Sequence, residues 1–233
     1  MQDTMRITTA DGAFGAYVAR PQAAPAPAIV VIHEVFGVNA DMRQSCDELA
    51  AKGYLAICPD LFWRIEPGLS LTDRTEAERA KANELYAAFD LDAGVRDIAA
   101  AIGAARATPG SNGRAGVVGY CLGGLLTYLS SARAVVDAAV AYYPGNADRH
   151  LQEAVGIAGP LMVHLAEEDE YIPSDARRQI VAALKGRAQV EVHTYPGCRH
   201  AFARHRGISY DARAAALANG RTDAFLARHL KAG

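Results

Sequence analysis

The sequence has few cysteines: there are four in 233 residues, and no two of them form a Cys-x-x-Cys pair. So small a number in a chain of this length excludes a disulfide scaffold. One cysteine has several histidines nearby, but their spacing fits no structural zinc pattern. The members of that group are Cys198, His193, His200 and His205. Cys46 and Cys58 are expected to be small buried hydrophobic residues, the usual fate of a free cysteine.

A large net charge and a long uniform apolar run are also lacking. With 24 basic and 26 acidic residues, the formal net charge is -2, which gives no electrostatic basis for binding nucleic acid or an acidic membrane surface. The longest segment without a charged residue, 115–132, is interrupted by glycine, serine and threonine, so no membrane-spanning helix is predicted. Residues 1–6 include an early acid and no apolar core of a signal peptide. We therefore expect a cytoplasmic protein.

Short apolar runs alternate with segments of helical periodicity through most of the chain. Runs of this kind suit strands that are buried on both faces of a parallel sheet. The predicted strands are 28–32, 55–58, 115–118, 138–142, 161–165 and 190–194. The predicted helices are 41–52, 75–89, 92–107, 122–132, 174–184 and 212–230, with Asp41 and Ser174 as N-caps. Residues 6–17, with the turn Asp11-Gly12, are predicted to form an antiparallel hairpin. The alternation predicts one α/β domain over residues 1–233, with a mostly parallel doubly wound sheet and helices on both faces.

The segment that follows the predicted strand 115–118 carries the clearest chemical motif. Gly119-Tyr120-Cys121-Leu122-Gly123 places a nucleophile between two glycines at a strand-to-helix turn, the nucleophile elbow of α/β-hydrolases. Side chains at Gly119 and Gly123 would clash in so sharp a turn. A helix that begins just after Cys121 favours the thiolate through its dipole and its unsatisfied N–H groups. The Leu122 N–H is expected to point at a developing oxyanion.

Polar residues that follow two later strands complete a candidate catalytic triad. Asp169 lies in an acidic run after strand 161–165, and His200 follows strand 190–194. Such sheets bind ligands beyond the carboxyl ends of their strands, so Cys121, Asp169 and His200 are expected on one edge, in the order nucleophile, acid, histidine. Glu168 is the alternative acid. Without these partners, Cys121 would be read equally well as a buried cysteine at a tight turn.

Seven short motifs in the chain resemble the motifs of one known protein family. They are GYCLGG at 119–124, HEVFGVN at 33–39, CPDL at 58–61, HAFAR at 200–204, AFD at 88–90, SNG at 111–113 and AALAN at 215–219. Together they resemble the dienelactone hydrolase (carboxymethylenebutenolidase) family, in register over nearly the whole chain. A cysteine in place of the elbow serine, joined to Glu-x-Phe-Gly-Val-Asn, is much more specific than the fold.

The resemblance implies an activity and a set of roles. It implies that 4-carboxymethylenebut-2-en-4-olide is hydrolysed to maleylacetate in the breakdown of chlorinated aromatic compounds, with no cofactor or metal. Cys121, Asp169 and His200 correspond to the family's triad, and the N–H groups of Val35 and Leu122 to its oxyanion donors. Glu34 corresponds to an additional carboxylate beside the thiol, which helps to generate the thiolate when substrate arrives. Repulsion between like charges predicts that the resting thiol is protonated.

The resemblance also implies how the substrate is held. Arg79 and Arg204 correspond to the pair that binds the substrate carboxylate, a task that suits the bidentate fork of arginine. The residues expected to line the pocket are Phe36, Asn83, Tyr86 and Ala201. Four positions depart from the family pattern. Ala201 stands in place of a serine, Asn83 in place of a tyrosine, Tyr86 in place of a tryptophan, and His33 in place of an uncharged amide.

Two other functions fit the same residues. The first is a general carboxylesterase or thioesterase that uses the same triad. The second is a non-catalytic binding or thiol-sensing protein built on this fold, against which Asp169, His200 and Glu34 argue. In each case the expected partner is a small molecule, a carboxylate-bearing lactone or ester in the main hypothesis. The sequence carries no signal for an oligomeric state, and a small enzyme of this kind can work as a monomer.

Overall fold

The structure, a computed structural model, describes residues 3–231 and forms two compact units that divide between Val117 and Val118. All eight strands belong to one sheet, whose pairs are antiparallel at its N-terminal edge and parallel where the later strands pair. This confirms the predicted α/β architecture. A single domain over residues 1–233 stays a prediction, and the two units are described in turn.

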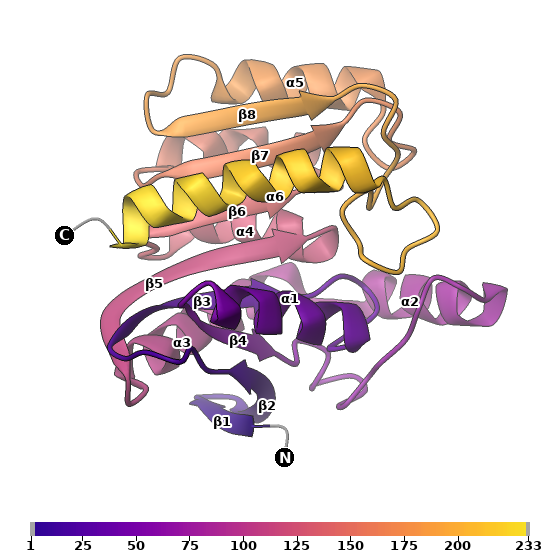
Figure 1. Ribbon diagram of the computed structural model, residues 1–233. Helices are drawn as coiled ribbons and strands as arrows, with labels where there is room; N and C mark the ends of the chain where they lie inside the picture. Colours follow the sequence, from indigo (N-terminus) through magenta and orange to yellow (C-terminus); the bar gives the residue numbers. More distant parts are fainter. Residues whose placement is uncertain (1–2, 232–233) are drawn as a thin grey trace. The chain divides into compact units, whose positions relative to one another are not determined.

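The first unit begins with the predicted hairpin. Strands β1 (Asp3–Thr9) and β2 (Gly12–Ala19) pair antiparallel, β2 also pairs antiparallel with β4 (Leu55–Pro59), and β4 pairs parallel with β3 (Ala26–Ile32). Every residue of β3 and β4 is buried, as their unbroken apolar sequences require. Helices α1 (Ala40–Ala51) and α3 (Leu91–Ala107) pack on these strands, whereas α2 (Glu76–Ala88) stands away from them (Figure 1).

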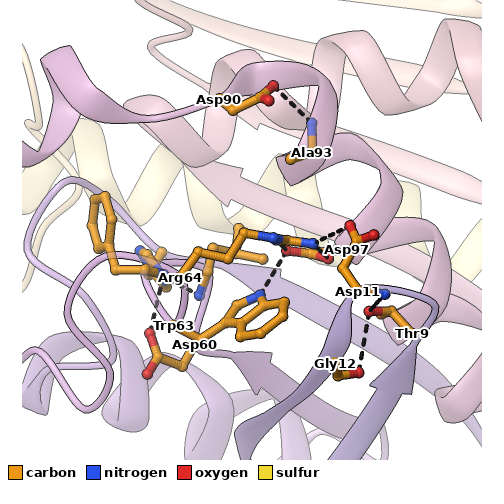
Figure 2. A network of polar contacts seen from close by, with 12 residues as sticks. Thr9, Asp11, Gly12, Asp60, Trp63, Arg64, Asp90, Ala93 and Asp97 are labelled. Carbon is orange, nitrogen blue, oxygen red and sulfur yellow. Dashed lines mark hydrogen bonds and ion pairs between the residues drawn. The ribbon is translucent and has the colours of Figure 1, made fainter.

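A polar network fixes the segment between β4 and α2 to the rest of the first unit (Figure 2). The indole N–H of Trp63 donates to Asp97 Oδ2 at 2.8 Å, and the Arg64 guanidinium binds both Asp97 and Asp11. Arg64 also lies 4.1 Å above the Trp63 ring, a cation–π contact. Asp97, on α3, is buried, and its charge is matched by that guanidinium. The network therefore ties the loop that leads to α2 both to α3 and to the β1–β2 turn.

The second unit starts with the last residues of β5 (Ser111–Tyr120) and continues with α4 (Leu122–Arg133). Strands β6 (Ala138–Tyr142), β7 (Leu161–Ala166) and β8 (Val190–Tyr195) pair in parallel, with His164 opposite His193. Helix α4 packs on β6, and α6 (Ala212–Leu226) lies across the near face of these strands in Figure 1. The unit also contains α5 (Ser174–Leu184), the 3₁₀ segment Ala147–Gly156 and a π-helical end, Ala227–Lys231.

The element boundaries differ from the predicted ones where side-chain chemistry is decisive. Both predicted N-caps are wrong. The Asn39 side chain accepts the N–H groups of Asp41 and Met42 and so caps α1, and Pro173 precedes α5, whose first residue is Ser174. Strand β5 begins at Ser111, earlier than predicted. Its first four residues were missed because they are polar or glycine and lie outside the buried part of the strand. Among the described residues, no helix is long and apolar enough to cross a membrane.

Candidate functional site

The turn between β5 and α4 has the geometry of the expected elbow. Cys121 has φ 55° and ψ -114°, a conformation that costs energy for any residue with a side chain. Its N–H donates to the carbonyl of Tyr142 at 3.1 Å. A Cβ on Gly119 would lie 2.0 Å from the Gly123 carbonyl oxygen, and one on Gly124 would lie 2.3 Å from that of Tyr142. Glycine is therefore required on both sides of Cys121, and the cysteine is held in a fixed, partly exposed position.

Helix α4 begins immediately after this cysteine, at Leu122. The Cys121 side chain makes no capping hydrogen bond to the first turn, so it does not occupy the N–H groups there. Such free donors, together with the positive end of the helix dipole, suit a negatively charged sulfur or oxygen.

The structure brings His200 and Asp169 together at the ends of β8 and β7. The Nδ1 of His200 lies 2.8 Å and 3.0 Å from the two carboxylate oxygens of Asp169. Oδ1 of the same carboxylate accepts the N–H groups of Tyr171 at 2.8 Å and of Ile172 at 3.1 Å. Both His200 and Asp169 are 5% exposed, whereas the alternative acid, Glu168, is exposed. The carboxylate is thus held by its own backbone turn and can orient the imidazole.

The charge state of His200 is set by its two neighbours. Burial lowers its pKa, but a negative charge on Cys121, present when the thiol is ionised, and the hydrogen bond with Asp169 outweigh this and raise the pKa to about 10. The other ring nitrogen, Nε2, is buried and makes no hydrogen bond of good geometry to the residues that the structure describes. Since Cys121 is among the groups that raise the pKa of His200, the two side chains are neighbours, and Nε2 is the nitrogen that can exchange a proton with the thiol.

We expect the proton on His200 to make the stability of the fold depend on pH. Because the pKa rises from 6.5 to about 10 on folding, the contribution to the free energy of unfolding is complete below pH 6.5. It is lost as the pH rises towards 10. Urea unfolding of the native chain and of His200→Gln at several pH values measures this. The native chain should lose stability relative to the variant across that interval, and parallel curves would contradict the assignment.

Two tyrosines beside His200 were missed by the sequence analysis. The ring centroid of Tyr171 lies 4.8 Å from that of the imidazole and the ring of Tyr143 lies at 5.0 Å, both edge to face. Tyr143 is buried, whereas Tyr171 is 62% exposed. Each follows the end of a strand, β6 for Tyr143 and β7 for Tyr171, so the rule that found Asp169 could have found them.

Arg204 lies in the second unit with these residues and is 6% exposed. It follows a turn in which its N–H donates to the carbonyl of Ala201 at 3.0 Å. Ala201 has φ 61°, so this segment is a turn and not a helix. Burial, Glu170 and Cys121 raise the pKa of Tyr171, while the charge of Arg204 lowers it. The Tyr171 hydroxyl therefore lies within reach of the charges of both Cys121 and Arg204.

The remaining candidate residues belong to the first unit. His33 and Glu34 are buried at the end of β3, and Val35 and Phe36 form the turn that follows. On α2, Arg79 and Asn83 are exposed and Tyr86 is partly exposed, on one face of the helix. The Arg79 guanidinium donates to the carbonyl of Asp73 at 2.6 Å. How these residues meet those around Cys121 stays a prediction.

No group of three or more His, Cys, Asp or Glu side chains within residues 3–231 is arranged to hold a metal ion. The cysteine–histidine group around Cys198 is used otherwise, since His200 binds Asp169 and His193 lies 3.6 Å from Glu191.

Comparisons with known proteins give a family and a fold. A profile described as the dienelactone hydrolase family matches residues 14–230. A "putative carboxymethylenebutenolidase" from Azospirillum brasilense is 46% identical over 222 residues, 94% of this chain and 95% of the relative. A carboxymethylenebutenolidase from Pseudomonas putida is 42% identical over 228 residues, 97% of each chain. The crystal structure of a "putative dienelactone hydrolase" from Klebsiella pneumoniae has a TM-score of 0.84 at 26% identity, covering 98% of this chain and 99% of the other.

Proposed function

Because this chain belongs to the dienelactone hydrolase family and is a hydrolase of lactones or esters, we propose that it converts 4-carboxymethylenebut-2-en-4-olide to maleylacetate with Cys121 as nucleophile. Curated relatives carry the name carboxymethylenebutenolidase. The observation that carries the proposal is the arrangement of the second unit: a cysteine on a strained elbow next to a buried histidine that is bonded to a buried aspartate.

The reaction begins when the Cys121 thiol gives its proton to His200 and the resulting thiolate attacks the lactone carbonyl carbon. The bond between that carbon and the ring oxygen breaks, and the ring opens to an enolate joined to the enzyme as a thioester. Water then attacks the thioester carbonyl, and its proton passes to the enolate oxygen, or to His200 after His200 has given its own proton to that oxygen. The carbon–sulfur bond breaks, the thiolate returns, and the enol product becomes maleylacetate. One water molecule is consumed, and no redox partner is needed.

Two anionic oxygens form in sequence during these steps. We place the Leu122 N–H, at the start of α4, and the Val35 N–H, after β3, as the donors to both of them. Pre-aimed backbone donors of this kind stabilise the transition state more than the ground state.

Glu34 is proposed to keep the resting thiol protonated. A buried carboxylate beside Cys121 disfavours a second negative charge there until an anionic substrate and a cationic arginine alter the balance. Glu34 is 1% exposed, which fits a carboxylate that acts inside a site and not on the surface. Ala201 lacks the family's serine hydroxyl near this glutamate, so we expect the substrate-dependent activation to be less sharply controlled here.

Arg204 and Arg79 are proposed to bind the substrate carboxylate, in a pocket lined by Phe36, Asn83, Tyr86 and Ala201. Arg204 supports this best, because its guanidinium is buried and close enough to Tyr171 to lower the pKa of that hydroxyl, and a buried guanidinium suits a buried anion.

The test is a comparison of kcat/KM for cis and trans dienelactone with kcat/KM for p-nitrophenyl acetate, in the native chain and in Arg204→Lys. Lysine keeps the charge but loses the fork, so dienelactone turnover should fall by about 10- to 100-fold. Turnover of the neutral ester should change by less than about threefold. Arg178→Lys on α5, whose arginine pairs with Asp175 at the surface, is the matched control. A native chain that strongly prefers the neutral ester would instead indicate a general carboxylesterase.

A further inference from the structure

The peptide group between Glu34 and Val35 is held by two hydrogen bonds to its oxygen. The Nδ1 of the His33 ring lies 2.6 Å from the Glu34 carbonyl oxygen, and the Gly37 N–H donates to the same oxygen at 3.3 Å. The second bond closes a four-residue turn with Val35 and Phe36 at its centre. Gly37 is pressed against the carbonyl of Leu69, where a Cβ would lie 2.2 Å from the oxygen, so this turn has little freedom to rotate.

The direction of the Val35 N–H follows from the direction of that carbonyl. The bond between Glu34 and Val35 is a trans peptide, so its C=O and N–H lie in one plane and point in opposite directions. Among residues 3–231, the Val35 N–H donates to no protein acceptor. A carbonyl that accepts hydrogen bonds also polarises its peptide group and makes the N–H a stronger donor. A group that hydrogen-bonds to the Glu34 carbonyl oxygen therefore fixes the direction of the Val35 N–H and makes it a stronger hydrogen-bond donor.

The tautomer of His33 is fixed by a second contact. The Leu61 N–H donates to Nε2 of His33 at 3.0 Å, so Nε2 must be the unprotonated nitrogen and Nδ1 must carry the hydrogen. His33 is fully buried, and burial lowers its pKa, which keeps the ring neutral. Its ring also packs at 5.3 Å from that of Phe62. The neutral imidazole thus offers one acceptor and one donor, as the family's amide at this position would.

We infer that His33 is a positioning residue for oxyanion binding: its Nδ1–H holds the Glu34 carbonyl and thereby aims the Val35 N–H at the oxygen of the tetrahedral intermediate. The inference rests on the proposed function, because it takes Val35 as an oxyanion donor. His33 itself does not touch the substrate. It acts through one peptide group, and the Leu61 N–H keeps it in the tautomer that can do so.

The test compares His33→Leu, which removes both hydrogen bonds, with His33→Gln, which keeps an acceptor and a donor. In His33→Leu we expect kcat to fall by about 10- to 100-fold, less than the loss of a whole oxyanion donor, with KM changed by less than about twofold. His33→Gln should recover most of the lost kcat. Affinity for a trifluoromethyl ketone, whose adduct with a cysteine bears an oxyanion, should fall with kcat. Affinity for the product carboxylate should not.

His164→Leu is the matched control, because His164 is also a fully buried histidine with a hydrogen bond at each ring nitrogen. It should lower stability without changing the ratio of ketone to product affinity. Equal loss of both affinities in His33→Leu would overturn the inference and leave His33 a structural residue. Full activity of Cys121→Ala would instead overturn the proposed function, so the two failures are distinguishable.

Should His33→Leu fail to fold, the native chain still decides the matter. In spectra of the uniformly ¹⁵N-labelled chain, His33 should be the tautomer protonated at Nδ1, and ketone binding should shift both the His33 Nδ1–H and the Val35 N–H signals. A Val35 signal that shifts while the His33 signal does not would overturn the inference, as would the other tautomer.

Discussion

Replacing Cys121 by alanine is expected to lower kcat on dienelactone by at least about 10⁴-fold, because removal of a nucleophile also removes the role of its histidine. The structure supports this expectation with a side chain that is held in an unfavourable backbone conformation and yet partly exposed. Strained backbone conformations of this kind cluster at functional sites. The fold should persist, since alanine removes only one sulfur atom at the surface of the turn. Single-turnover assays with either isomer, alongside thermal unfolding, measure both effects.

Two further measurements identify the sulfur itself as the reacting atom. Cys121→Ser should recover little activity, because serine has no accessible anion at neutral pH and Glu34 disfavours forming one. Iodoacetamide labelling reports on Cys121, because the other three cysteines are buried. Labelling of the resting enzyme should be slow, because the proposed resting thiol is protonated. Fast labelling without a ligand, combined with no turnover of dienelactone or simple esters by the native chain, would favour a thiol sensor over an enzyme.

Much of the fold was predictable because its signals are local. The apolar runs that became β3, β4, β6 and β7 are buried throughout, and a sheet covered on both faces removes such runs from water. The N-caps were wrong for an equally physical reason. Several residues near a helix start can accept backbone N–H groups, and tertiary structure selects among them. Asn39 does so because its side chain also donates to the carbonyl of Leu71, a residue far along the chain.

The candidate site was predictable to the extent that strand ends determine it. Cys121, Asp169 and His200 follow three strands of one sheet. Because residues after parallel strands lie at the same edge, the sequence alone was enough to predict that they lie together. Tyr171 and Tyr143 follow strand ends too, but tyrosines are common in cores and loops, and nothing local marks these two. The two hydrogen bonds of His33 were beyond sequence reasoning, because one of them joins residues 28 positions apart.

The second large effect is expected for Asp169→Asn, with a loss in kcat of about 10⁴-fold and little loss of stability. The asparagine oxygen can keep accepting the N–H groups of Tyr171 and Ile172, so the turn survives. Its NH₂ group would then face His200 Nδ1 and would force the imidazole to carry its hydrogen on Nε2. A histidine in that tautomer cannot take the proton of the Cys121 thiol.

The same substitution removes a charge, so it also shifts the pH dependence. The hydrogen bond and charge of Asp169 are among the causes that raise the pKa of His200, and the pKa should therefore fall in the variant. Residual activity should then depend on pH at lower values than in the native enzyme.

Glu168→Gln is the matched control: the same chemical change one residue earlier, on an exposed side chain, should alter kcat by less than about twofold. If Glu168→Gln were the inactive variant and Asp169→Asn the active one, Asp169 would have no catalytic role and the acid of the triad would be Glu168. Rate profiles of the three proteins between pH 5 and 10, with denaturant unfolding to confirm that each is folded, distinguish these outcomes.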